Sequence, residues 1–225
     1  MRFIIEFDGP VFDSASVYYA AHQAAAAEVG WSQLDRDTFW RLLRTRGRQA
    51  DLLPGAKPVK IAEYEKCFDA HLESDALLAS YQPQQDIRQT LAQLTRWGSC
   101  FLITLGSNPA ERRTALEKHG LPGYFSRFDR LEADPRRRPA QLRQLCEADP
   151  RSLVVAASDA LIRSAGEAGT LGVGIAAGPC SVARLHQAGA SVVYKALHEL
   201  SASIRDGAAD LVQAGLLPRS LDAPP

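Results

Sequence analysis

Short apolar runs, rich in β-branched and aromatic residues and bounded by turn formers, recur along the chain. They cover residues 3–7, 100–104, 153–157, 172–176 and 191–194. Near-continuous apolar runs of this length are typical of parallel strands buried on both faces, because helices cover both sides of such a sheet. The pattern therefore predicts five buried parallel strands.

The segments between the last four runs carry the signals of helix ends. Asn108 can cap a helix that starts at Pro109 and ends before Gly120, and Ser158 or Asp159 can cap a second helix. Alternating strands and helices are typical of a doubly wound, Rossmann-like α/β sheet, in which ligands bind beyond the carboxyl ends of the strands. We expect the functional residues at those ends.

Residues 8–99 contain no run of comparable strand quality. Helical patterns instead cover residues 14–29, 36–44, 59–80 and 84–97, and a loop rich in proline and glycine covers residues 47–58. We interpret this region as an α-helical cap inserted after the first strand. The expected domains are an α/β core of residues 1–13 and 85–217, a helical cap of residues 14–84 and a flexible tail of residues 218–225.

Composition narrows the possible classes of function. The 225 residues are 46% apolar, which suits a full core, and 26 basic residues balance 26 acidic ones. The net charge therefore gives no indication of binding to nucleic acid or to an anionic membrane surface. No apolar run approaches the roughly 18 residues of a membrane span, and the N-terminus lacks the pattern of a signal peptide. We expect a cytoplasmic protein that binds a small polar molecule or a protein partner.

The first strand and its turn carry candidate chemistry. They read IIEFDGPVFDS, with Glu6 and Asp8 on one face of the strand. This segment resembles the first motif of haloacid-dehalogenase-like phosphatases, Asp-x-Asp-Gly-Thr, in the form that phosphoglycolate phosphatases have. Later segments resemble the family's further motifs in the same order: ITLGSNPAERRTALEKHGL, RRRP, LVVAASDALIRSAGEAG and AGASVVYKALHEL. The resemblance implies a haloacid-dehalogenase-like core whose first strand lies in the middle of the sheet.

The resemblance also implies roles for individual residues. In the family, one aspartate attacks the phosphoryl group and a second acts as general acid and base. Glu6 stands at the nucleophile position and Asp8 at the acid–base position, while Thr104 and Arg138 stand at phosphate-binding positions. Glutamate carries its carboxyl about 1.5 Å further than aspartate, and a misplacement of about 1 Å can cost around 10²-fold in rate. We expect Glu6 to be a poor nucleophile.

The family's magnesium-binding acids are absent from the fourth motif, where Ala157 and Leu161 stand instead. Mg²⁺ needs hard oxygen ligands in near-octahedral geometry, and apolar side chains supply none. Asp159 lies nearby, but its side chain would have to reach back from a helix start. The four cysteines and five histidines also show no ligand spacing. We therefore expect no metal and no other cofactor, unless the protein is an enzyme that retains Mg²⁺.

Structural interpretations remain open for the same residues. The Thr104 hydroxyl can bond the neighbouring backbone, Asp8 can form a salt bridge to Arg138 or cap the following turn, and Pro10 removes an N–H that a phosphate-cradling loop offers. The basic run at residues 136–138 is either a solvated loop or a patch for an acidic partner. The aromatic residues of the cap form either its core or a docking surface.

The sequence favours a catalytically inactive protein that uses this phosphatase fold for binding, regulation or scaffolding. Its partner is a protein that contacts the cap or the loop of Arg136, Arg137 and Arg138, or a small phosphorylated ligand. The alternative is a divergent Mg²⁺-dependent phosphatase of a small phosphomonoester such as phosphoglycolate, in which Glu6 and Asp8 act unconventionally. A third hypothesis is a structural subunit of a larger assembly.

Overall fold

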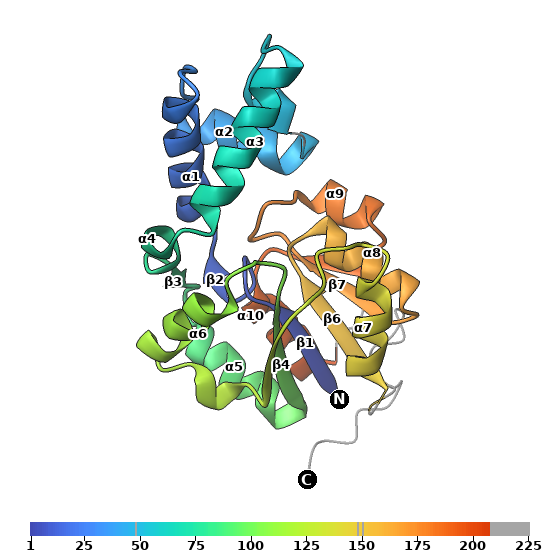
Figure 1. Ribbon diagram of the computed structural model, residues 1–225. Helices are drawn as coiled ribbons and strands as arrows, with labels where there is room; N and C mark the ends of the chain where they lie inside the picture. The colour runs from blue at the N-terminus through green and yellow to red at the C-terminus, as the bar shows by residue number, and fades with distance from the viewer. Residues whose placement is uncertain (48, 148, 150, 208–225) are drawn as a thin grey trace.

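A six-stranded parallel sheet forms the centre of the molecule. The computed structural model describes residues 1–47, 49–147, 149 and 151–207 (Figure 1), so the tail predicted at 218–225 and the core's predicted end lie outside the described residues. The strand order is β5-β4-β1-β6-β7-β8. The strands are β1 (Arg2–Glu6), β4 (Ser99–Thr104), β5 (Arg127–Arg130), β6 (Ser152–Ala156), β7 (Leu171–Ile175) and β8 (Val192–Tyr194). The predicted α/β class and the central position of the first strand are confirmed.

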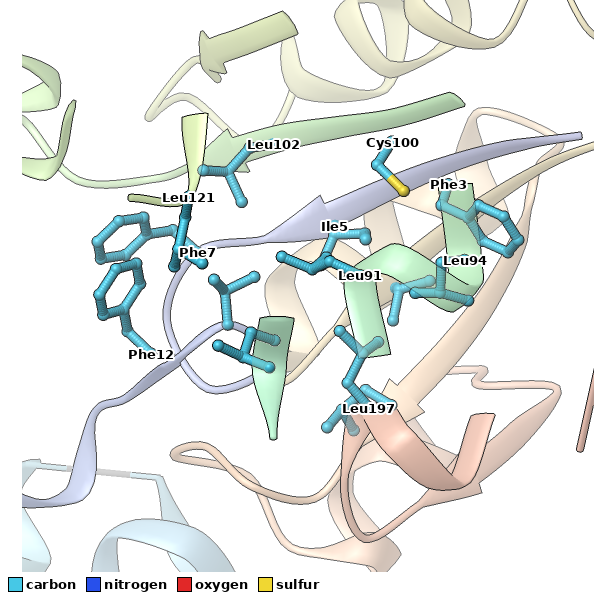
Figure 2. Close-up of a cluster of buried hydrophobic side chains, with 14 of the residues drawn as sticks. Phe3, Ile5, Phe7, Phe12, Leu91, Leu94, Cys100, Leu102, Leu121 and Leu197 are labelled. Atoms are coloured by element: carbon cyan, nitrogen blue, oxygen red, sulfur yellow. The ribbon is translucent and has the colours of Figure 1, made fainter. Parts of the chain in front are cut away.

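Helices cover both faces of this sheet, as the apolar runs predict. The core helices are α5 (Ile87–Trp97), α6 (Pro109–Lys118), α7 (Arg138–Cys146), α8 (Asp159–Glu167), α9 (Val182–Gln187) and α10 (Leu197–Arg205), and a short turn η2 spans Pro122–Tyr124. Phe3 and Ile5 of β1 pack against α5 and α10 on one face (Figure 2), whereas Ile4 packs with the residues of α7 and α8 on the other. Because successive side chains of β1 point to opposite faces of the sheet, β1 packs against the helices on both sides.

The structure differs from the predicted sheet by one additional strand. All five predicted strands are present, and each begins and ends within one residue of its predicted bounds. The strand β5 was not predicted. Its sequence, RFDR, is charged and only partly buried because β5 is an edge strand. An edge strand lacks the continuous apolar run on which the prediction depended.

Four helices and a short turn form the cap above the carboxyl ends of the strands (Figure 1). They are α1 (Ala15–Glu28), α2 (Arg36–Arg46), η1 (Gln49–Leu52), α3 (Pro58–Leu72) and α4 (Asp75–Leu78). The helix predicted over 59–80 is two helices, because the chain turns at Glu73 and Ser74. A two-stranded ribbon of β2 (Phe12–Asp13) and β3 (Gln82–Pro83) joins cap and core, next to the predicted boundaries.

The cap has its own hydrophobic cluster around Phe39, Tyr64 and Phe68, separate from the two clusters of the core. His22 is buried there, where its Nδ1 lies 2.7 Å from the Tyr64 hydroxyl and its Nε2 accepts the N–H of Leu34. Burial lowers the pKa of His22 to about 4, so the imidazole is neutral. The aromatic residues at these positions are core residues of the cap.

Two arginines fasten the cap to the core on the side of α2 and α9. Arg44 of α2 donates to the carbonyl of Ala176, at 2.7 Å, and its own carbonyl accepts the N–H of Ser181. Arg184 of α9 donates to the carbonyl of Leu43 at 2.8 Å.

Among the helices that the structure describes, none is long and apolar enough to cross a membrane.

Candidate functional site

A cavity of about 170 Å³ lies between the strand ends and the cap. The polar and charged side chains in its wall come from the end of β1 and the turn after it, α1, the α3–α4 turn, the residue before β3, α6 and the start of α8. They are Glu6, Asp8, Tyr18, Glu73, Tyr81, Arg112 and Ser158. The cavity therefore lies where a doubly wound sheet places its ligands. It contains both carboxylates that the sequence analysis singled out.

Glu6 ends β1 and is 4% exposed. Its Oε2 accepts the backbone N–H groups of Ala157, at 2.7 Å, and Ser158, at 2.9 Å. Burial, together with the charge of Asp8, raises the pKa of Glu6 to about 7, although the hydrogen bonds from Ser158 and Ala157 lower it. The longer side chain thus crosses to the end of β6, where its oxygen is held by two amides.

Asp8 lies in the turn after β1, where Gly9 has a positive φ of 97° and the chain folds back to a bridge with Phe12. The Tyr81 hydroxyl donates to its Oδ1, and the Nε of Arg112 lies 3.7 Å from its Oδ2. Burial raises the pKa of Asp8, although the Arg112 charge and the Tyr81 hydrogen bond oppose that rise. Both carboxylates therefore already have internal partners.

Among the described residues, Arg112 is the cation in the wall of this cavity, and no sequence motif pointed to it. The side chain is 3% exposed and forms two parallel hydrogen bonds to Glu73, each 2.9 Å long. Glu73 also accepts the N–H of Asn108, at 2.9 Å, and the hydroxyl of Ser107, at 3.0 Å. The helical spacing of α6 could have singled out Arg112, because this spacing puts it on the buried face with Ala115 and Leu116. An arginine on a buried face needs a partner of opposite charge.

The position of the family's first magnesium-binding acid is closely packed. Ala157 is fully buried, and a Cβ built on Gly9 or on Gly178 would lie 2.5 Å or 2.4 Å from the Ala157 Cβ. Leu161 is fully buried in the core cluster with Leu142 and Leu185. No cluster of three His, Cys, Asp or Glu suited to a metal occurs within the part of the chain that the structure describes. The residues present do not fit Mg²⁺, which requires several oxygen ligands.

Comparison with known proteins places this geometry in a fold. No family model matches the chain, and no curated protein matches it. A haloacid dehalogenase-like hydrolase from Streptococcus pneumoniae aligns over 90% of this chain and 97% of its own, with a TM-score of 0.71 and 13% identity. A predicted phosphoglycolate phosphatase from Haemophilus somnus aligns over 88% and 95%, with a TM-score of 0.62 and 15% identity. This chain has the haloacid-dehalogenase-like fold.

A third solved structure shows the same likeness in fold. The haloacid-dehalogenase superfamily hydrolase of subfamily IA from Geobacter sulfurreducens aligns over 92% of this chain and 96% of its own, with a TM-score of 0.59 and 22% identity. At identities of 13–22% the likeness establishes the haloacid-dehalogenase-like fold. Activity must be argued from the residues of the site.

Two residues at phosphate-binding positions of the haloacid-dehalogenase-like fold have structural contacts here. Thr104 is fully buried, and its hydroxyl accepts the N–H of Gly106 at 3.0 Å. Arg138 donates to the carbonyls of Glu132, at 3.0 Å, and Ala133, at 2.8 Å. Neither lines the cavity. A contact of either residue with phosphate stays a prediction.

The interpretation that Arg138 forms a salt bridge with Asp8 is wrong, because Arg112 is the arginine beside that carboxylate. Arg138 is also not a loop residue: it is the buried first residue of α7, whereas Arg136 and Arg137 are exposed. Asp159 is likewise engaged elsewhere, since its Oδ2 accepts from Arg184 at 3.1 Å. It therefore does not supply the acid that position 157 lacks.

Proposed function

We propose that this protein is a non-catalytic binding or regulatory protein built on the haloacid-dehalogenase-like fold. The observation that carries this proposal is the packing of Ala157 against the backbone of Gly9 and Gly178. Position 157 thus carries a methyl group between two glycines, where the resemblance implies a magnesium-binding acid, and it supplies no oxygen ligand. Glu6 adds to the argument, because its Oε2 is directed to the amides of Ala157 and Ser158.

The charges of the cavity support the proposal. Phosphoryl transfer depends on cations that neutralise the phosphate oxygens and align the attacking group. Here Glu6, Asp8 and Glu73 contribute three carboxyl groups, and Arg112 is the one arginine or lysine among the described residues that line the cavity. Arg112 is moreover already paired with Glu73. A bound phosphomonoester would meet carboxylates without a bridging metal ion.

A divergent phosphatase is the second candidate, and one observation favours it. Because its pKa is raised to about 7, Glu6 is partly protonated at neutral pH, which is the range in which general acids and bases work well. In this alternative, Glu6 or Asp8 acts unconventionally on a small phosphomonoester such as phosphoglycolate, and the enzyme requires Mg²⁺.

The proposed partner is a protein that docks on the cap or on the loop that carries Arg136 and Arg137. Both arginines are exposed, which suits an acidic partner. A small phosphorylated ligand in the cavity is the other partner consistent with a binding role. The proposal includes no nucleic acid, no membrane and no cofactor, and it places the protein in the cytoplasm.

Phosphate release tests this proposal. Wild type and Asp8→Ala are compared on a panel of small phosphomonoesters that includes phosphoglycolate, with and without Mg²⁺, and Asp206→Ala serves as the control because Asp206 pairs with Arg205 on an exposed surface. We expect none of the three proteins to release phosphate above the background of the protein-free reaction. Release by wild type and Asp206→Ala with Mg²⁺, abolished in Asp8→Ala, would establish the divergent phosphatase instead.

A further inference from the structure

Glu73 connects the cap with the cavity of the core. It follows directly after α3, and its side chain, 26% exposed, reaches the start of α6. There its carboxylate accepts four hydrogen bonds: two from Arg112, one from the N–H of Asn108 and one from the Ser107 hydroxyl. A cap residue thus satisfies all of these core donors at once.

These donors are the set that binds a free oxyanion. Backbone N–H groups at a helix start and a two-pronged arginine are the usual contacts of phosphate and carboxylate groups. Arg112 is held in place because it is buried, and a Cβ on Gly106 would overlap its guanidinium group, at 2.1 Å from Cζ. Its Nε is buried without a hydrogen-bond partner among the described residues and faces Asp8. Contacts other than those with Glu73 therefore also hold the Arg112 side chain in place.

We propose that Glu73 is an internal occupant of an oxyanion site formed by Arg112, Asn108 and Ser107, and that a phosphate group enters this site only by displacing Glu73. The contact is autoinhibitory, and it also latches the α3–α4 turn of the cap to α6. Displacement by a ligand frees that turn from the core. Ligand binding thereby changes the contacts between cap and core. This inference rests on the proposed function and extends it.

Other charged groups around the cradle determine how strongly Glu73 excludes ligands. Asp8 lies on the far side of Arg112 and Glu6 lies beyond it. An added dianion therefore meets these two carboxyl groups in any case, and it meets the charge of Glu73 as well unless Glu73 leaves. Partial burial raises the pKa of Glu73, but the hydrogen bonds and charge of Arg112 outweigh this and hold the pKa below its ordinary value. Glu73 is therefore ionised at neutral pH and competes directly with any oxyanion.

The test measures the affinity of inorganic phosphate by calorimetry in wild type, Glu73→Ala and Glu73→Gln. The matched control is Glu65→Ala, which removes an exposed glutamate from α3 and leaves the cradle filled. We expect both Glu73 variants to bind phosphate at least about tenfold more tightly than wild type and the control, a difference of about 1.4 kcal/mol. Adding Arg112→Ala to Glu73→Ala is expected to abolish the gain.

Equal affinities in wild type and both Glu73 variants would overturn the proposal. So would a gain of the same size in Glu65→Ala, which would indicate a general charge effect. Failure of both Glu73 variants to fold, judged by circular dichroism and gel filtration, would assign Glu73 a purely structural role and would overturn it too. Because binding is measured without turnover, this result is separate from the phosphate-release assay: tight binding with hydrolysis would disprove only the non-catalytic role.

Discussion

At the scale of single residues, the extra methylene of Glu6 changes what its carboxyl contacts. Its Oε2 accepts hydrogen bonds from the backbone N–H groups of Ala157 and Ser158, which follow the end of the neighbouring strand β6. Burial is the main reason that its pKa is raised to about 7. A carboxyl that is both hydrogen-bonded to amides and partly protonated is a weak nucleophile, which agrees with the expectation from its length.

Glu6→Gln should change the pH dependence of stability. The pKa of Glu6 is raised from 4.5 to about 7, so the folded protein holds a proton there that the unfolded chain releases. Stability from this group is complete below pH 4.5 and is lost as pH rises through about 7. Glutamine stays neutral, so we expect the unfolding free energy of Glu6→Gln relative to wild type to be about 3 kcal/mol more favourable at pH 8 than at pH 4.

Urea denaturation of both proteins at pH 4 and pH 8 checks this prediction. The difference between variant and wild type removes the contributions of groups that both proteins share, such as His22. Glu65→Gln is the control, because Glu65 is exposed on α3. A relative stability that is the same at both pH values would show that Glu6 is not protonated in the folded protein.

Ala157→Asp should destabilise the protein rather than restore a metal site. The Ala157 Cβ already packs against Gly9 and Gly178, so a larger side chain forces the backbone apart and buries a second carboxylate beside Glu6. Overpacking alone costs roughly 1–3 kcal/mol, and burying an unpaired charge adds to that. We expect a loss of about 3 kcal/mol or more in chemical denaturation.

The exposed variant Ala62→Asp on α3 controls for the added charge, and it should change stability by about 0.5 kcal/mol or less. If Ala157→Asp were as stable as this control and gained Mg²⁺-dependent phosphate release, the close packing at position 157 would be no barrier to a metal site. That outcome would favour recent loss of an active enzyme over a remodelled site.

At the scale of elements, the cap is joined to the core at two further places besides the ribbon of β2 and β3. Glu73 pairs with Arg112 on one side, and Arg44 and Arg184 bridge α2 and the start of α9 on the other. Arg184 also pairs with Asp159 at 3.1 Å. A cap with contacts on opposite sides is expected to open less readily than one held by a linker alone.

Arg184→Ala should loosen the α2–α9 side without unfolding the core. The substitution removes the hydrogen bonds to the carbonyls of Leu43 and Pro179 and the pair with Asp159. Hydrogen bonds to charged groups contribute about 1.5–3 kcal/mol each at most, so amide exchange in residues 36–45 and 176–181 should become several-fold faster. Arg41→Ala, an exposed position on α2, is the matched control. Unchanged exchange in Arg184→Ala would mean that packing alone holds this side.

The elements also show where sequence patterns fail. Buried parallel strands were predictable because helices cover both of their faces, so their sequences are continuously apolar. β5 was missed because it lies at the sheet edge with charged residues. The turn that separates α3 from α4 was missed as well, because Glu73 and Ser74 fit a helical pattern locally while Glu73 is held by Arg112 in the core.

At the scale of the whole molecule, the sequence predicted the fold and singled out two residues that line the cavity. Glu6 and Asp8 were found because they lie in one strand-end motif. Glu73 and Arg112 were not, because their pairing joins residues 39 positions apart across the cap and core, and no local pattern encodes it. Arg138 was predicted as a partner of Asp8 for the same reason. The alignment with the family's motifs identifies a position in the sequence, whereas the packing of α6 determines that Arg112 is the arginine that enters the cavity.

The carboxylate oxygens of the cavity are already engaged in internal contacts and cannot assemble around a divalent ion. Binding of Mn²⁺, a paramagnetic substitute for Mg²⁺, tests this most directly through water proton relaxation in wild type and in Asp8→Asn. We predict weak binding that is identical in the two proteins, as expected for scattered surface carboxylates. One stoichiometric site that is present in wild type and lost in Asp8→Asn would contradict the account and would reinstate a metal-dependent enzyme.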